Sequence, residues 1–449
     1  MQLKDIIESP CGFGYVLEQL DLQSGYARRC LLDASMMTDG KEISASYDVL
    51  KHFAAFLNRI ERVHLHTLLH KLMCLKDLRG TIANLKHRAV LDDIELFEVK
   101  HLSMLAGDVK ILLDQYEMSE VVDIPELDAV IDILDPDGMR IATFYVYDSY
   151  SEKLRTLRAL MRKQPERQEE LLLESTRIED DIRTDLSNRL YSYADALEKA
   201  QQTLAMVDIA IAKARQMQYW GLCFPTVAVD EKTTYNNMFH PQVKDVLAKS
   251  NMSFQPVNIS FGTTPTLITG ANMGGKTVVL KTLTLCQYLF QFGFGIPAGE
   301  ATIALKDEIY FCIGDEQSVE KGLSSFAAEM KNIDAVIKAS REGRKILALI
   351  DEPARTTNPV EGTALVSALL SVLAGDNVSL IMTTHYDIEP GEARCLRVRG
   401  FDQGVMNYEL VEVLDGEVPH EALNIAQSLG IDPQWLNKAR ALLGMPDIH

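Results

Sequence analysis

The feature that most constrains this chain is a short glycine-rich run: Gly270, Ala271, Asn272, Met273, Gly274, Gly275, Lys276 and Thr277. It follows an apolar stretch with strand character, Thr266–Thr269, and precedes a helical pattern from Val278 to about Phe292. A G-x-x-x-x-G-K-[ST] segment between a strand and a helix is typical of a phosphate-binding loop. The glycines let backbone N–H groups face a phosphate, and the helix N-terminus adds partial positive charge.

The side chains that end this run predict a nucleoside triphosphate with Mg²⁺. Lys276 is placed to reach the β- and γ-phosphate oxygens, and the Thr277 hydroxyl is placed to bind Mg²⁺. The plain alternative is a chance glycine-rich turn before a helix. The complete pattern, in its strand-to-helix setting, favours the phosphate loop, with ATP and Mg²⁺ as cofactors.

A second motif supplies two carboxylates. The apolar run Ile346–Ile350 ends in Asp351 and Glu352, which is typical of a buried parallel strand that delivers acids at its carboxyl end. Asp351 is predicted to hold Mg²⁺ and Glu352 to polarise the attacking water as a general base. Such a strand end is a weak signal alone, but it follows the loop within the same predicted domain.

Two further segments fit the same site. His385 follows the apolar strand Val378–Met382, where it could sense a γ-phosphate; the alternative is an ordinary loop histidine. Ser324 lies in the run Gly322–Met330, just before a helical pattern. Its local interpretation is a helix N-cap. Its functional interpretation is a signature loop that presents the serine hydroxyl to a γ-phosphate across a dimer interface.

Composition limits the class of protein. The net charge is −19, and no basic stripe of the kind usual in DNA-binding proteins is obvious, so nucleic acid is a less expected partner, although a local basic patch stays compatible with this charge. The seven cysteines lie far apart without a Cys-x-x-Cys pair, which predicts reduced thiols and no zinc site. Without a signal-peptide pattern or a long apolar run, the sequence predicts a cytoplasmic protein with no membrane partner.

The pattern along the chain predicts three parts: an N-terminal helical segment (1–45), a helical core and lever domain (46–222) and an α/β ATPase domain (223–449). A helix that stops near Pro165 and a long periodic segment from Ile178 to Ile211 predict an antiparallel helical pair that projects as a lever, rather than a compact bundle. A turn at 133–138 and a strand over 141–147 are expected between helices. The polar stretch 230–237 is expected to be a linker.

Taken together, these motifs resemble the ATPase of the MutS mismatch-repair family, in that family's order and at similar spacing. The resemblance rests on the segments at 270–277, 322–330, 351–362 and 384–386, and extends to an ABC-like P-loop fold and a closing helix–turn–helix near 421–440. It spans the chain from about residue 45 onward, and its motifs are concentrated in residues 240–445. It implies that Lys276, Thr277, Asp351, Glu352 and His385 have the roles given above. It also implies that Ser324 completes the site of a neighbouring subunit, in a homodimer with two composite ATP sites.

The departures from that family are also informative. The chain contains no Phe-x-Glu, the mismatch-reading wedge of the family, and few residues precede the core helices. The mismatch-recognition and connector domains are therefore expected to be missing, and the segment 150–215 looks too short for a full DNA clamp. Ala271, Pro353 and Ala354 replace the residues usual in the family. These changes should alter the conformation of the loops and leave the metal and water ligands in place.

The sequence leaves two kinds of client open. The family implies structured or mismatched DNA, in repair or recombination, whereas the acidic charge, the absent wedge and the short lever favour ATP-driven remodelling of a protein client. A dimeric scaffold with little hydrolysis is a third, weaker possibility, against which the intact acid pair argues. His66 and His70 share a helix face, but no third ligand is placed beside them, so a zinc site is not expected.

Overall fold

The computed structural model describes residues 1–270, 275–313, 325–355, 357–386, 388–389, 391–402, 405–413, 423, 426 and 430–442. The chain forms two compact units: unit 1 comprises residues 1–19, 35–47 and 216 onward, and unit 2 comprises 20–34 and 48–215. Residues 1–45, expected as one N-terminal segment, therefore contribute to both units. Along the part of the chain described here, no helix combines the length and the apolar character needed to cross a membrane.

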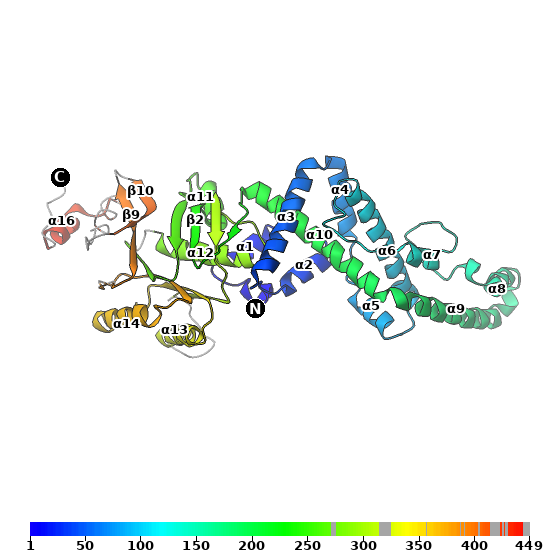
Figure 1. Ribbon diagram of the computed structural model, residues 1–449. Coiled ribbons are helices and arrows are strands. Elements are labelled where there is room, and N and C mark those ends of the chain that lie inside the picture. Colours follow the sequence, from blue (N-terminus) through cyan, green and yellow to red (C-terminus); the bar gives the residue numbers. More distant parts are fainter. Residues whose placement is uncertain are drawn as a thin grey trace. The chain divides into compact units, whose positions relative to one another are not determined.

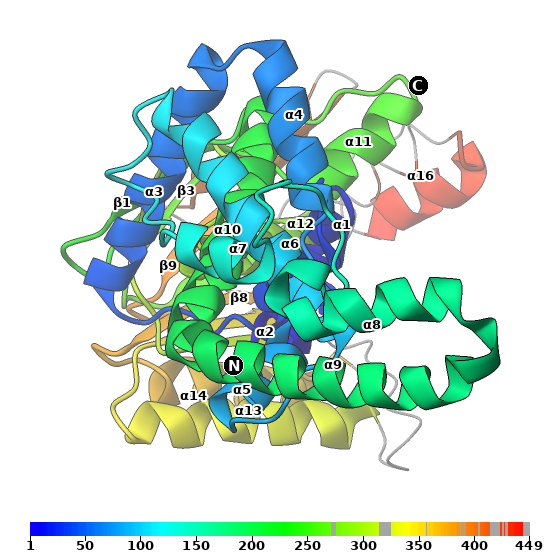
Figure 2. The same ribbon diagram turned by 90° about the vertical axis from the view of Figure 1, so that its right-hand side faces the viewer.

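Unit 2 is built from helices (Figures 1 and 2), which confirms the predicted helical character of this region. In chain order these are α2 (Gly25–Asp33), α3 (Gly40–Arg59, from residue 48), α4 (Arg62–Met73), α5 (Arg79–Lys86), α6 (Asp93–Asp114), α7 (Asp128–Leu134), α8 (Glu152–Lys163), α9 (Gln168–Leu190) and α10 (Ala194–Trp220, up to residue 215). Three short 3-10 turns interrupt them: η2 (Asp148–Tyr150), η3 (Pro165–Arg167) and η4 (Tyr191–Tyr193).

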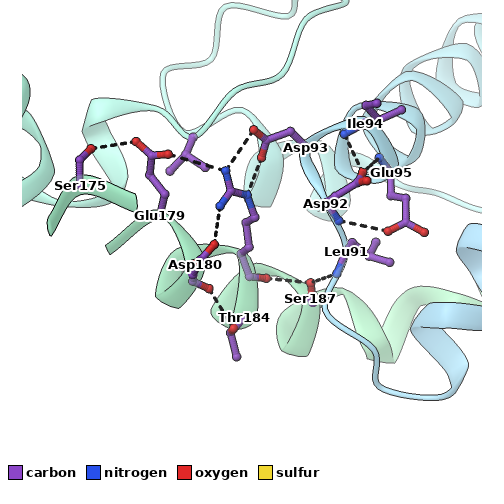
Figure 3. Close-up of polar contacts among 12 residues, drawn as sticks. Leu91, Asp92, Asp93, Ile94, Glu95, Ser175, Glu179, Asp180, Thr184 and Ser187 are labelled. Carbon is purple, nitrogen blue, oxygen red and sulfur yellow. Dashed lines mark hydrogen bonds and ion pairs between the residues drawn. The ribbon is translucent and has the colours of Figure 1, made fainter. Parts of the chain in front are cut away.

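The start of α6 is fixed by its own sequence and by an ion pair from α9. Asp92 accepts hydrogen bonds from the N–H groups of Ile94 (2.9 Å) and Glu95 (2.8 Å), and Glu95 returns a bond to the Asp92 N–H, which makes a capping box. Arg183 of α9 donates from Nε to Asp93 (2.7 Å). Figure 3 shows Asp93 on the side of Asp180 and Glu179 of α9, whereas Asp92 turns to Ile94 and Glu95.

Helices α8 and α9 pack side by side, as the predicted antiparallel pair requires (Figure 2). Arg158 of α8 pairs with Glu179 of α9 (2.9 Å), and Lys153 pairs with Glu174 (2.8 Å). The long periodic segment is not one helix, however, because η4 separates α9 from α10. Ser192 in this turn donates its hydroxyl to the Arg189 carbonyl (3.3 Å), a local bond of the kind that competes with helix continuation.

The prediction of a strand over 141–147 is wrong, because these residues form no strand. The turn predicted before it is confirmed by the hydrogen bond from the Gly138 N–H to the Asp135 carbonyl (2.9 Å). A strand needs a neighbouring strand to pair its backbone groups, and unit 2 offers none. Side chains take that place here: the Thr143 carbonyl accepts hydrogen bonds from Lys100 Nζ (3.1 Å) and from the Tyr147 hydroxyl (3.0 Å).

Unit 1 contains a six-stranded sheet with the order β10-β9-β4-β8-β7-β6, in which every neighbouring pair is parallel except β9 and β10. The strands are β4 (Thr266–Thr269), β6 (Glu308–Ile313), β7 (Ile346–Asp351), β8 (Val378–Thr383), β9 (Arg394–Asp402) and β10 (Val405–Glu412). Helices α12 (Lys276–Gln291), α13 (Ser325–Arg341) and α14 (Pro359–Val372) cover it, and α16 (Pro433–Leu442) follows near the C-terminus. This confirms the predicted α/β fold.

The two faces of this sheet pack against different helices. Ile346, Ala348 and Ile350 of β7 share a buried core with α13 and α14, and so do Val378, Leu380 and Met382 of β8; Figure 1 shows α13 and α14 on one face of the sheet. Because side chains alternate along a strand, Asp351 and Thr383 point to the opposite face. Helix α12 contacts β6, β7 and β8, so the ends of two central strands face its N-terminal turn.

A smaller sheet with the order β1-β5-β2-β3 completes unit 1. Its strands are β1 (Thr226–Val227), β2 (Thr233–Met238), β3 (Val257–Phe261) and β5 (Glu300–Ile303), with α11 (Pro241–Lys249) between β2 and β3. The stretch expected as a linker thus contains a strand. Thr233 and Tyr235 are buried while Asn236 and Asn237 are exposed, so β2 has one buried face. The linker was predicted because most residues of this stretch are polar.

The N-terminal residues of unit 1 pack around the far end of α12. They contain η1 (Leu3–Ile6) and α1 (Phe13–Glu18), and the Phe13 ring meets Tyr288, Phe292 and Phe294 edge-on. Tyr47 of α3 donates its hydroxyl to the Phe294 carbonyl (2.7 Å). These contacts hold the C-terminal end of the helix whose N-terminus carries Lys276 and Thr277.

Candidate nucleotide-binding site

The glycine-rich run joins β4 to α12, which is the setting that the sequence predicts. Gly270 follows β4 with φ +124°, and Gly275 immediately precedes α12 with φ +74°. Both values favour glycine, and a Cβ at position 275 would also lie 3.1 Å from a ring carbon of Tyr408. Residues 271–274 of the predicted loop lie outside the described residues.

Lys276 begins α12 and is almost fully buried, with 4% of its surface exposed. Its Nζ donates to the Gly270 carbonyl at 2.6 Å and lies 3.6 Å from Oε1 of Glu352. The ammonium therefore lies between the loop and the acid that the sequence assigns to water activation. A buried cation at a helix N-terminus beside glycines is well placed to meet phosphate oxygens.

The Thr277 hydroxyl and the Asp351 carboxylate are in direct contact. Thr277 Oγ1 donates to Oδ2 of Asp351 at 2.7 Å, and Thr383 Oγ1 donates to Oδ1 of the same carboxylate at 2.6 Å. Both carboxylate oxygens are thus oriented, and Asp351 is buried. The structure brings together the two residues that the sequence predicts as Mg²⁺ ligands, although they come from different elements.

Thr383 is a residue whose role sequence reasoning missed. Besides its bond to Asp351, its Oγ1 accepts the Glu352 N–H at 2.9 Å, so one hydroxyl binds the carboxylate of the first acid and the backbone of the second. Its place at the end of an apolar strand, beside His385, was visible in the sequence. The signal that could have found it is the period of two along β8: positions 378, 380 and 382 face the core, so 383 faces the site.

Glu352 begins a tight turn after β7 and is half-buried. Its carboxylate lies between two cations: Oε1 faces Lys276, and Oε2 lies 3.5 Å from Nη1 of Arg355. The turn continues to Ala354, whose N–H donates to Oε1 of Glu329 in α13 (3.1 Å). Burial raises the pKa of the Glu329 carboxyl.

Of the other two predicted site residues, the structure describes His385 but not Ser324. His385 follows β8 directly after Thr384, and its side chain is exposed, with its ring 4.3 Å from the ring of Tyr386. Ser324 lies outside the described residues, immediately before α13.

The donor set fits a magnesium ion. Mg²⁺ prefers oxygen ligands and is usually bound by one or two protein groups together with waters and substrate phosphates. The Thr277 hydroxyl and the Asp351 carboxylate provide such a pair beside a helix N-terminus. The described residues contain no group of three or more histidines, cysteines or carboxylates that could hold a metal by themselves, so this pair would depend on phosphate and water for the remaining ligands.

A mainly parallel sheet with a glycine-flanked strand-to-helix turn, a buried lysine and a strand-end acid pair is the architecture of a P-loop nucleoside triphosphatase domain. The comparison with protein families agrees: residues 266–409 match MutS domain V. The chain therefore carries a MutS domain V, which is an ATPase domain.

Relatives among characterised proteins extend this likeness beyond the domain. The Endonuclease MutS2 of Carboxydothermus hydrogenoformans is 33% identical over 284 residues, which is 61% of this chain and 35% of the relative. The Endonuclease MutS2 of Thermus thermophilus is 33% identical over 270 residues, or 58% and 34%. That of Staphylococcus epidermidis is 31% identical over 278 residues, or 59% and 34%. The chain matches about a third of the length of these relatives.

Proposed function

We propose that this chain is a Mg²⁺-dependent ATPase that works as a homodimer and couples its nucleotide state to movement of the helical unit, with structured DNA as its client. The observation that carries the proposal is the cluster in which Thr277 and Thr383 orient Asp351 while Glu352 lies beside Lys276. A hydroxyl, two acids and a buried lysine are the groups that phosphoryl transfer to water requires.

In this proposal each group has one task. The loop 270–277 binds the phosphates through backbone N–H groups and Lys276. Thr277 and Asp351 hold Mg²⁺, which neutralises charge on the β- and γ-phosphates when it is bound. Glu352 accepts a proton from the attacking water. His385, exposed at the end of β8, contacts the γ-phosphate.

Variants of Ser324 test whether the protein works as a dimer with composite ATP sites. If each site combines the loop of one subunit with Ser324 of the other, Ser324→Ala and Lys276→Ala should each lose most hydrolysis alone. Mixing the two variants should restore activity, because a mixed dimer contains one site with both native residues. Steady-state phosphate release measures this, and sedimentation with ATP measures the dimer. Mixtures as inactive as their components would contradict the composite site.

A DNA client is supported by the relatives, whose names describe endonucleases, and by the surface of α8. Arg155, Arg162 and Lys163 are exposed on α8. Spacings of seven and eight residues place them on one side of a helix. Free cations on one helix face are suited to contact phosphates along a nucleic-acid backbone.

A protein client is the second candidate, and two observations favour it. The net charge of −19 opposes close approach of a polyanion. On α9, the adjacent side chains of Leu172 and Leu173 are 53% and 61% exposed. Exposed leucines next to each other on a helix are more suited to a protein surface than to a phosphate backbone.

The experiment that separates the clients is DNA binding across salt concentrations, with homoduplex, mismatched and four-way substrates. If α8 contacts phosphates, the variant R155A/R162A/K163A should bind more weakly and lose roughly 0.9 of the log–log salt slope for each contact removed. Lys153→Ala is the matched control, because Lys153 is already paired with Glu174. Absence of DNA binding at low salt would reject DNA in favour of the protein client, and L172S/L173S would then be the variant that weakens binding.

A further inference from the structure

The turn that follows the two acids is sterically unfavourable by itself. Glu352 has φ +46° and Ala354 has φ +61°, on either side of Pro353. Residues with a Cβ are disfavoured in this left-handed region, and such conformations persist only where surrounding contacts hold them. The conformation of this turn decides where the Glu352 carboxylate lies.

Side chains from outside the turn bind its peptide groups. The Glu352 N–H donates to Thr383 Oγ1 of β8 (2.9 Å). The Ala354 N–H donates to Oε1 of Glu329 in α13 (3.1 Å), and the Ala354 carbonyl accepts the Tyr386 hydroxyl (2.7 Å). Ala354 itself is 1% exposed, so unpaired peptide groups here would have no access to water.

We propose that Glu329 and Tyr386 are positioning residues for ATP hydrolysis, which hold the Ala354 peptide from both sides and thereby keep the Glu352 carboxylate in place beside Lys276. Both residues bind the Ala354 peptide, two residues after the acid, so they act on the acid through the turn. Arg355, the next residue, lies 3.5 Å from the same carboxylate and would move with the turn.

The packing around Tyr386 supports this role. Gly362 lies in α14, where alanine would ordinarily favour the helix. A Cβ at position 362 would overlap the Tyr386 hydroxyl and ring. The absence of a side chain at this helical position therefore leaves the space in which the tyrosine reaches Ala354.

The contacts predict an effect on turnover and not on nucleotide affinity. Phosphate binding depends on the loop and Lys276, whereas proton removal depends on the position of Glu352. A displacement of about 1 Å at a reacting group can cost up to roughly a hundredfold in rate. Loss of either hydrogen bond should therefore lower kcat while KM and the Kd for ATP stay near their native values.

Glu329→Ala, Glu329→Gln and Tyr386→Phe in the full-length protein test the proposal. We expect kcat to fall roughly tenfold or more in Glu329→Ala and Tyr386→Phe, with ATP affinity within about twofold of native. Glu329→Gln should recover most activity, because its amide oxygen can still accept the Ala354 N–H. Asp334→Ala, an exposed acid on the same helix, is the matched control.

Gly362→Ala provides an independent variant that leaves every hydrogen-bonding group in place. It should reproduce the kinetic defect of Tyr386→Phe, because its Cβ would displace the Tyr386 hydroxyl from the Ala354 carbonyl. Native kcat in both Tyr386→Phe and Glu329→Ala would overturn the proposal. So would an equal loss in Glu329→Ala and Glu329→Gln, which would show that the charge matters and not the acceptor. A loss of ATP affinity parallel to kcat would instead indicate a structural role, and would also overturn it.

Discussion

Lys276→Ala is expected to lose ATP binding. Lys276 is buried at the start of α12, with its Nζ bonded to the Gly270 carbonyl and 3.6 Å from Glu352. Its removal deletes a charged donor to phosphate, a contact worth about 1.5–3 kcal/mol per hydrogen bond. Two such bonds correspond to a loss of affinity on the order of a hundredfold or more. Equilibrium titration with a fluorescent ATP analogue and Mg²⁺ measures this change.

The matched control is Lys281→Ala, which removes a lysine from the same helix after the loop has ended. It should bind ATP as the native protein does. Removal of Lys276 also leaves Glu352 without one of its two cations, so Lys276→Met, which keeps the buried stem, separates lost packing from lost charge. Native affinity in both Lys276 variants would reject the assigned phosphate loop.

Glu352→Gln is expected to bind ATP and fail to hydrolyse it. The amide keeps the shape of the side chain and can still lie beside Lys276 and Arg355, but it cannot accept a proton from water. Loss of a general base lowers the rate by roughly 10²–10⁴. Single-turnover hydrolysis of labelled ATP should show the loss, while a binding titration shows affinity close to native.

Glu342→Gln serves as the control, because Glu342 is an exposed carboxylate paired with Arg344 at the end of α13. Its hydrolysis rate should equal that of the native protein. Unimpaired steady-state hydrolysis in Glu352→Gln would falsify the assignment of the base, and attention would move to water held by Asp351 or His385.

Sequence reasoning succeeded for local structure that depends on neighbours along the chain. The strand-to-helix setting of the glycine-rich run, the place of the two acids at the end of β7 and the pairing of α8 with α9 could be predicted from spacing and composition. It failed for two segments: 141–147 was predicted to be a strand and is not one, whereas 233–238, most of which was predicted to belong to a linker, forms a strand. The β-branched, aromatic run at 141–147 has no partner strand, whereas the polar run that forms β2 pairs with both β3 and β5. Pairing between strands is a property of the fold, so composition alone could not decide either case.

What the amino-acid sequence determined by itself is which groups to propose as the reacting ones: Lys276, Thr277, Asp351 and Glu352 stand out because a glycine-rich strand-to-helix run and a strand-end acid pair each occupy a short, continuous stretch. What only the tertiary structure decided is how those groups are oriented. Thr383, Glu329 and Tyr386 come from β8, α13 and the segment after β8, and they meet the acids and their turn only because parallel strands end at one edge of the sheet. Hydrogen bonds act over about 3 Å, so contacts between distant parts of the chain exist only once folding has placed those parts together.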